Sequence, residues 1–290
     1  MDISFSGTDT ILQSVKSRTS RPREGFFTIL TVLHADGTSQ TVVAEDDVLR
    51  TVRSGDLLYT IETGLTTSKP VSVSYRVREY DLRSGKGRTL IGPQQRNVLG
   101  IDLYNDRLYV LRRLDTPGRV LLSMGTIPVG RGDLESSHTL SMSDVLPPEV
   151  VSMGTFWVFR GLAYCPVQFI KQTPQYGVCR VDFASKTVEK LLEAPRYLDF
   201  CIVPDGPHLA YLSPDSPATG TRHAYTLTFL PLGETTERPV AAKLNAGEIR
   251  FYGGLQYDAK GRSFVIRGNT PPYSPPNQYF YRIRVNNVSN

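Results

Sequence analysis

Short runs of alternating apolar and polar residues, each preceded by a tight turn, recur along the whole chain. In the stretch 203–216, VPDGPHLAYLSPDS, a Pro-Asp-Gly turn comes directly before an apolar segment. Related phrases are GTDTILQSV, SGDLLYTIE, YNDRLYVLRR, FRGLAYCPV and YDAKGRSFVIRG. Alternation with a period of two between turns rich in Gly, Asp and Asn predicts β-hairpins, with almost no support for helices.

These phrases return at a regular interval, which predicts a repeat protein. One apolar position can be taken as equivalent in each phrase: Ile11, Leu57, Leu108, Leu162, Leu209 and Phe264. Their spacing is roughly 46 to 55 residues, typical of propeller-type repeats. A second hairpin follows each phrase, with turns such as Ala35–Gly37 and Ser84–Gly87.

A four-stranded unit of this kind cannot bury both of its faces alone, so the units must stack on one another. We therefore expect residues 1–290 to form a single all-β domain, a β-propeller of six blades, mostly with four antiparallel strands. Five or seven blades, or two β-sandwiches, are the alternatives, and the regular spacing disfavours the sandwiches.

The sequences of segments 203–240 and 255–285 resemble the TolB-like and WD40-like propeller repeats. The resemblance rests on the Pro-Asp-Gly turn, the Leu-Ala-Tyr strand and the later Gly-Glu hairpin turn. It covers the repeat only. Such repeats serve many unrelated functions, so it implies the architecture and no activity.

Long connections are expected at one end of the blades. In a propeller, the turns between the first and second strands and between the third and fourth leave at one end, and the remaining connections leave at the other. The predicted connections between second and third strands are long: 17–25, 64–70, 171–176, 214–222 and 270–277. The segment 141–153, which enters the fourth blade, lies at the same end. Long loops on one side of a rigid scaffold usually carry binding residues.

The candidate contact residues in or beside these loops are Arg18, Arg21, Arg23, Tyr176, Arg222, His223 and Tyr273. Arginine suits carboxylates and phosphates, and a proline-braced tyrosine is a stiff aromatic contact. The alternatives are a solvated loop at 16–25 and a proline-rich loop packed on its own blade at 269–281. The net charge of +5 is spread along the chain, so nucleic acid is a weakly supported partner and another protein the preferred one.

Catalytic motifs are not found in the sequence. The four histidines form no His-x-His or His-Glu-x-x-His pair, and neither a Gly-x-Ser-x-Gly elbow nor a phosphate-binding loop occurs. We expect no metal and no cofactor. Cys165, Cys179 and Cys201 lie in apolar runs and are predicted to be buried, with a Cys165–Cys179 disulfide as the alternative.

The sequence therefore predicts a non-catalytic protein-binding or scaffold module that uses its long-loop face, alone or within a larger assembly. A propeller enzyme or small-ligand binder with a site in the central channel is the alternative. The chain start lacks the basic and apolar regions of a signal peptide, and no run of 18 apolar residues occurs, so we expect a cytoplasmic protein without a membrane span. Either Met1–Gly7 completes the last blade or that blade has three strands, unless the chain is part of a larger protein.

Overall fold

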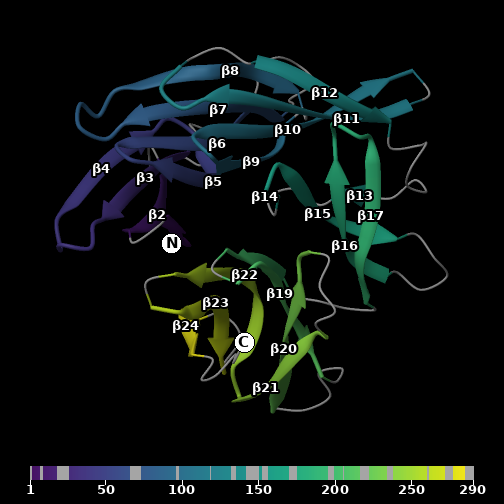
Figure 1. Cartoon of the computed structure of the whole chain (residues 1–290). Coiled ribbons are helices and arrows are strands. Elements are labelled where there is room, and N and C mark those ends of the chain that lie inside the picture. The colour runs from purple at the N-terminus through teal and green to yellow at the C-terminus, as the bar shows by residue number, and fades with distance from the viewer. Residues whose placement is uncertain are drawn as a thin grey trace. The chain divides into compact units, whose positions relative to one another are not determined.

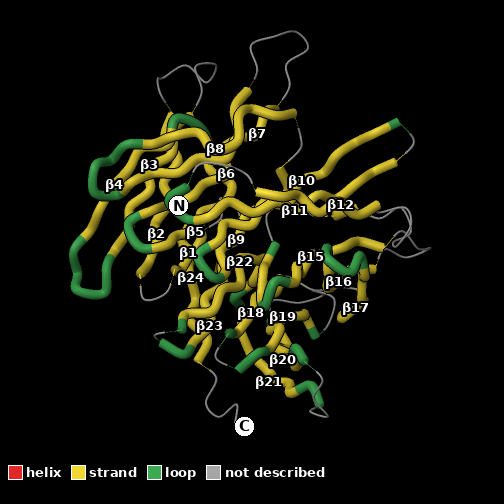
Figure 2. The backbone as a smooth tube through the Cα atoms, turned by 45° about the horizontal axis from the view of Figure 1, so that its top comes forward, coloured by secondary structure: helices red, strands yellow, loops and turns green. Residues whose placement is uncertain are grey.

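The computed structural model describes residues 2–6, 9–17, 26–65, 73–95, 98–117, 119–131, 135–141, 150–151, 156–169, 175–194, 199–204, 206–215, 222–233, 238–259, 261–271 and 277–284. Within these ranges the backbone forms β-strands and loops without a helix (Figure 2). No described segment is therefore a helix long and apolar enough to cross a membrane. The strands form six small antiparallel sheets in chain order, and the fold is a six-bladed β-propeller, as predicted.

The chain divides into two compact units. Unit 1 comprises Met1–Gln172 and Val178–Leu192, and unit 2 comprises Thr173–Gly177 and Glu193–Asn290. The first three sheets and most of the fourth belong to unit 1, while the fifth and sixth belong to unit 2 (Figure 1).

The strands of unit 1 follow one another in each sheet in chain order. The first sheet contains β1 (Asp2–Ser6), β2 (Asp9–Ser17), β3 (Phe26–Leu33) and β4 (Ser39–Ala44). The second contains β5 (Asp47–Ser54), β6 (Leu57–Leu65), β7 (Val73–Asp81) and β8 (Gly87–Gln95). The third contains β9 (Val98–Tyr104), β10 (Arg107–Thr116), β11 (Arg119–Pro128) and β12 (Glu135–Ser141).

The fourth sheet has five strands, because its first position is shared by two short ones. It contains β13 (Val150–Val151), β14 (Trp157–Phe159), β15 (Leu162–Phe169), β16 (Gln175–Asp182) and β17 (Thr187–Ala194). β14 pairs with the start of β15, and β13 pairs with its far end at Val167 and Gln168. The sequence did not indicate β13, which falls inside the predicted connection 141–153.

Unit 2 contains the last two sheets. The fifth has β18 (Asp199–Val203), β19 (His208–Pro214), β20 (His223–Pro231) and β21 (Val240–Gly247). The sixth has β22 (Arg250–Asp258), β23 (Ser263–Thr270) and β24 (Asn277–Arg284). Because β1 pairs with β2 in the first sheet, the described residues give the last sheet three strands, one of the two expected arrangements.

Tight turns join the first strand of a sheet to the second, as at Asn105–Asp106, and the third to the fourth, as after β16. Asn105 and Asp106 both have positive φ, 48° and 54°, as the type I′ hairpin turn requires. Asp182 stabilises the turn after β16, where its Oδ1 accepts hydrogen bonds from the backbone N–H groups of Ala184 (2.9 Å) and Ser185 (3.2 Å). In each of the six repeated phrases, the strand after the turn is the second of its sheet, and the innermost strand precedes the turn.

Within each unit, neighbouring sheets meet through their first strands: β1 with β5, β5 with β9 and β9 with β14 in unit 1, and β18 with β22 in unit 2. Apolar clusters fill the spaces between sheets. One joins Leu99 and Leu111 of the third sheet to Phe156 and Phe183 of the fourth. The three cysteines are free and buried, so the prediction of small buried side chains is confirmed and no disulfide forms.

Candidate functional site

The strand bounds confirm where the long connections lie. The predicted segments join β2 to β3, β6 to β7, β15 to β16, β19 to β20 and β23 to β24, each a second strand to a third. In an antiparallel sheet these connections leave at the same end as the link to the next sheet. We call it the long-connection end of each sheet.

Three of the predicted contact residues can be placed at this end. Tyr176 is the second residue of β16 and is 37% exposed. Arg222 is exposed directly before β20, and His223 is the half-buried first residue of that strand. Arg18, Arg21, Arg23 and Tyr273 lie outside the described residues.

A series of aromatic rings crosses the long-connection end of unit 2. The ring centroids of His223 and Tyr225 are 6.4 Å apart, and those of Tyr225 and Phe251 are 4.8 Å apart. The series continues from Phe251 to Tyr281 at 5.7 Å and from Tyr281 to Tyr279 at 6.3 Å. These rings come from β20, β22 and β24, so His223 packs at one end of a row of rings, buried at Tyr225 and Phe251, that the sequence did not indicate.

Arginines accompany the exposed tyrosines of the sixth sheet. Tyr252 of β22 and Tyr279 of β24 are 38% and 49% exposed, and Arg250 is exposed two residues before Tyr252. The guanidinium carbon of Arg267 lies 5.9 Å from the ring centroid of Tyr252, within cation–π range. We call Arg250, Tyr252, Arg267, Tyr279 and Tyr281 the tyrosine–arginine patch.

The Tyr281 hydroxyl of this patch stays protonated at neutral pH because its pKa is raised. Burial raises the pKa of Tyr281, and the neighbouring Tyr279 and Tyr252 raise it further. The patch therefore presents hydroxyl groups that donate and accept hydrogen bonds, beside guanidinium groups that only donate. Such a surface suits contact with carboxylates and with the polar backbone of another protein.

A glycine bulge in β22 shapes the patch. The pairing of β22 with β23 shifts register between Phe251 and Gly253 and again between Gly253 and Gln256. Gly253 and Gly254 have φ values of 136° and 73°, which favour glycine. A Cβ atom on Gly254 would lie 2.8 Å from Nε of Arg267, so a side chain there would displace the arginine that faces Tyr252.

The bulge is fixed by Asp199 of the neighbouring sheet. Its buried carboxylate accepts hydrogen bonds at Oδ2 from the N–H groups of Gly254 (2.7 Å) and Leu255 (3.0 Å), while Oδ1 accepts one from Phe200 (2.8 Å). Asp199 thereby links β18 to β22 inside unit 2. No local pattern indicates this bond, because 55 residues separate Asp199 from Gly254.

Gly268 of β23 lets two aromatic rings pack close to the backbone. A Cβ atom at this position would lie 3.0 Å from the ring of Phe251 and 3.0 Å from that of Tyr281. Both contacts are tighter than normal van der Waals distance. The patch therefore depends on glycine on both of the strands, β22 and β23, that carry its arginines.

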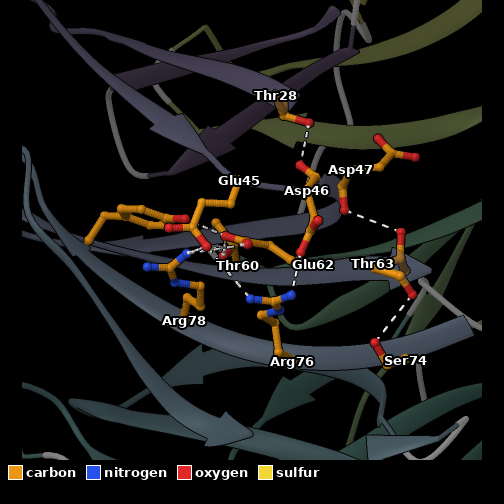
Figure 3. Close-up of polar contacts among 12 residues, drawn as sticks. Thr28, Glu45, Asp46, Asp47, Thr60, Glu62, Thr63, Ser74, Arg76 and Arg78 are labelled. Atoms are coloured by element: carbon orange, nitrogen blue, oxygen red, sulfur yellow. Dashed lines mark hydrogen bonds and ion pairs between the residues drawn. The ribbon is translucent and has the colours of Figure 1, made fainter. Parts of the chain in front are cut away.

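A second polar group lies at the long-connection end of the second sheet, in unit 1. Figure 3 shows Arg76 and Arg78 of β7 pointing toward the segment between β4 and β5. Nη2 of Arg76 is 2.6 Å from Oδ2 of Asp46, and Nη1 of Arg78 is 3.0 Å from Oε2 of Glu45. We call Glu45, Asp46, Glu62, Arg76 and Arg78 the acid–arginine cluster.

Glu62 is the fully buried member of that cluster. Its Oε1 accepts hydrogen bonds from the Tyr80 hydroxyl at 2.5 Å and from Thr60 Oγ1 at 3.0 Å. Burial raises the pKa of Glu62, and it outweighs these hydrogen bonds and the nearby Arg78, which lower the pKa. Because the acids and arginines pair with each other, the cluster holds the segment between β4 and β5 against β6 and β7. The acidic run 45–47 and the Arg-x-Arg of β7 were its sequence signals.

A third polar group joins the innermost strands of unit 1. Arg50 of β5 donates from Nε to the carbonyl oxygen of Ile101 (2.9 Å) and from Nη2 to that of Phe156 (3.1 Å), with its guanidinium carbon 4.9 Å from the Trp157 ring centroid. Asp102 Oδ2 accepts from the N–H of Val158 at 2.5 Å. Burial raises the pKa of Asp102 to about 6, although Arg50 opposes the shift. These bonds link three successive sheets.

Comparisons with known proteins identify the fold and no family. No protein-family model and no curated protein matches the chain, so the likeness to TolB-like and WD40-like repeats stays a resemblance. Among solved structures, the chain is similar to the acylaminoacyl peptidase of Pyrococcus horikoshii in two structures. Their TM-scores are 0.54 and 0.53, their identities 10% and 9%, and each match covers 97% of this chain and 50% of the peptidase.

A putative 6-phosphogluconolactonase from Bacteroides uniformis aligns with a TM-score of 0.45 at 10% identity, covering 96% of this chain and 97% of that one. The match to the Pyrococcus horikoshii peptidase is different in extent, because the chain spans about half of that protein's length. At such low identities the likenesses concern the fold, which hosts many unrelated functions.

Proposed function

We propose that the chain is a non-catalytic protein-binding module that engages its partner through the long-connection end of its blades, alone or as part of a larger assembly. The observation that carries the proposal is the tyrosine–arginine patch of the sixth sheet. Tyrosine and arginine are enriched in the centres of protein–protein interfaces and among the residues that dominate binding energy.

The patch is suited to this role because its parts are held in place before binding. Tyrosine offers a large contact area and loses little conformational entropy on binding. The ring contacts between Phe251, Tyr281 and Tyr279 and the glycine bulge beside Tyr252 fix the backbone beneath the exposed side chains. A preorganised surface avoids part of the entropic cost of association.

Carboxylates are the expected counterpart on the partner. Arg250 is exposed two residues before Tyr252 in β22, and the Arg267 guanidinium faces the Tyr252 ring. Guanidinium groups bind carboxylates through two parallel hydrogen bonds. We therefore expect an acidic protein surface rather than an apolar one.

A double variant, Arg250→Ser with Tyr252→Ser, tests the proposal without altering β24. The matched control is Val240→Ser with Arg262→Ser, which removes one exposed apolar side chain of the fifth sheet and one arginine of the sixth, both near the end opposite the patch. Proteins retained from a native extract by the wild-type chain and by the control should be lost by the patch variant, while all three unfold at similar temperatures. Retention of the same proteins by the patch variant refutes the proposal.

The loop residues predicted from the sequence belong to the same proposal. Exchanging Arg18, Arg21 and Arg23 for Glu and Tyr273 for Ala should also weaken capture with little change in thermal unfolding. Nuclease treatment of the extract separates protein capture from capture through nucleic acid, which would show a steep dependence on salt.

A further inference from the structure

The outer edge of β24 differs from the corresponding edge in the other sheets. In the other five sheets a further strand pairs with the third strand, as β4 does with β3 and β21 with β20. In the described part of the chain, no strand pairs with the outer edge of β24. An open edge presents a row of backbone N–H and C=O groups that can accept another strand.

β24 has the regular geometry that strand addition needs. Its eight residues pair with β23 without a register shift, from Asn277 opposite Thr270 to Arg284 opposite Ser263. It contains no proline and no bulge, two devices that commonly protect edge strands. Its pairing with β23 is therefore uninterrupted over the full length of the strand.

The two faces of β24 differ in chemistry. Side chains alternate along a strand, so Tyr279, Tyr281 and Ile283 share one face, while Arg282 and Arg284 share the other. Tyr281 packs on Phe251, and Arg282 lies 3.2 Å from the Asp258 carboxylate with 47% of its side chain exposed. The strand, NQYFYRIR, contains no acidic residue.

We infer that the outer edge of β24 binds an extended segment of a partner protein as a fourth strand, and that apolar and acidic residues alternate in this segment. The backbone edge supplies the hydrogen bonds, and cross-strand pairs supply the selectivity: apolar residues beside the tyrosines and Ile283, carboxylates beside the arginines. The inference rests on the proposed protein-binding function and shares Tyr279 and Tyr281 with the patch, but it depends on the backbone edge and the arginines of β24, so each can fail separately.

Charge favours such a partner over a second copy of this chain. Edge-to-edge pairing of two copies would add a strand with two further arginines and no carboxylate to the edge that already has Arg282 and Arg284. Like charges on neighbouring strands destabilise pairing, whereas opposite charges stabilise it.

The test uses an end-blocked peptide in which valine and glutamate alternate, matched to the eight residues of β24. Fluorescence anisotropy should show binding at least about tenfold tighter than that of the valine–lysine peptide, a difference of about 1.4 kcal/mol. Arg284→Glu should remove this preference, and the control Arg262→Glu, on the turn before β23, should keep it. Equal affinities for the two peptides, or no binding of either, would overturn the inference.

N-methylation of the peptide distinguishes strand addition from contact through side chains alone. In a strand, alternate N–H groups face the same way, so methylating one alternate set should abolish binding and methylating the other should leave it. Equal effects of both sets contradict the inference.

Hydrogen exchange of β24 should be fast for alternate amides in the free chain and slow with the peptide. Slow exchange without peptide, from cover by the chain's own residues or a second copy, also contradicts it. Binding of the peptide to the Arg250→Ser, Tyr252→Ser variant separates this site from the patch.

Discussion

Replacement of Asp199 by Ala should destabilise unit 2 strongly. The carboxylate accepts hydrogen bonds from Gly254 at 2.7 Å and from Leu255 at 3.0 Å, and both join β18 to β22. A hydrogen bond to a charged group contributes about 1.5–3 kcal/mol, so the loss of two should lower the free energy of unfolding by about 3–6 kcal/mol. Leu255 is buried, so water cannot easily replace the carboxylate at its N–H group.

The assay is urea unfolding followed by circular dichroism, because the single tryptophan, Trp157, lies in unit 1 and would not report on unit 2. Asp182→Ala is the matched control. It also removes two carboxylate–backbone hydrogen bonds, but those to Ala184 and Ser185 lie in an exposed turn. We expect the control to lose about 0.5–1.5 kcal/mol. Equal losses in the two variants would refute the argument that burial makes the Asp199 bonds strong.

Three further predictions concern other parts of the fold. Burial raises the pKa of the Asp102 carboxyl group from 3.8 to about 6, so the folded state binds a proton there more tightly than the unfolded state does. The free energy of unfolding should therefore fall by ~3 kcal/mol as the pH rises from 4 to above 6. Asp102→Asn should remove that loss in urea titrations at several pH values, and an unchanged pH profile would contradict the prediction. Gly268→Ala should lower the free energy of unfolding by about 1–3 kcal/mol and alter the near-ultraviolet dichroism of the packed rings, whereas no change would show that the rings move aside freely. Burial raises the pKa of the Cys165 thiol to about 12, so a thiol reagent should label it in urea but not in the folded chain, and rapid labelling of the native protein would be the contrary result.

The sequence predicted the hairpins because their causes are local. Turns such as Asn105–Asp106 and the strands that follow them are specified by adjacent residues, and their regular spacing gave the number of blades. β13 escaped prediction because two residues are too few for a periodic pattern. The last sheet's three strands were one of two expected arrangements, and only strand pairing could decide between them.

The candidate site was predicted less completely because it depends on contacts between distant segments. Arg222 and His223 were identified from their place beside a long connection, but Arg250, Tyr252 and Tyr279 were not. In a single sequence these residues look like ordinary strand positions. What sets them apart is the packing of β20, β22 and β24 against one another, which joins residues from three separate hairpins.

Because of the glycine bulge, the number of residues in this part of β22 has a structural consequence. Between Phe251 and Gln256, β22 contains extra residues relative to the paired segment of β23. The number of these residues decides which side of the sheet the later side chains of β22 face. Deleting either Gly253 or Gly254 would turn Tyr257 and its neighbours to the opposite side of the sheet. Homologous chains should therefore tolerate insertions in the loop after β23 far more readily than a single deletion here, and a homologue that lacks one glycine should also have dispensed with the aspartate that holds the bulge.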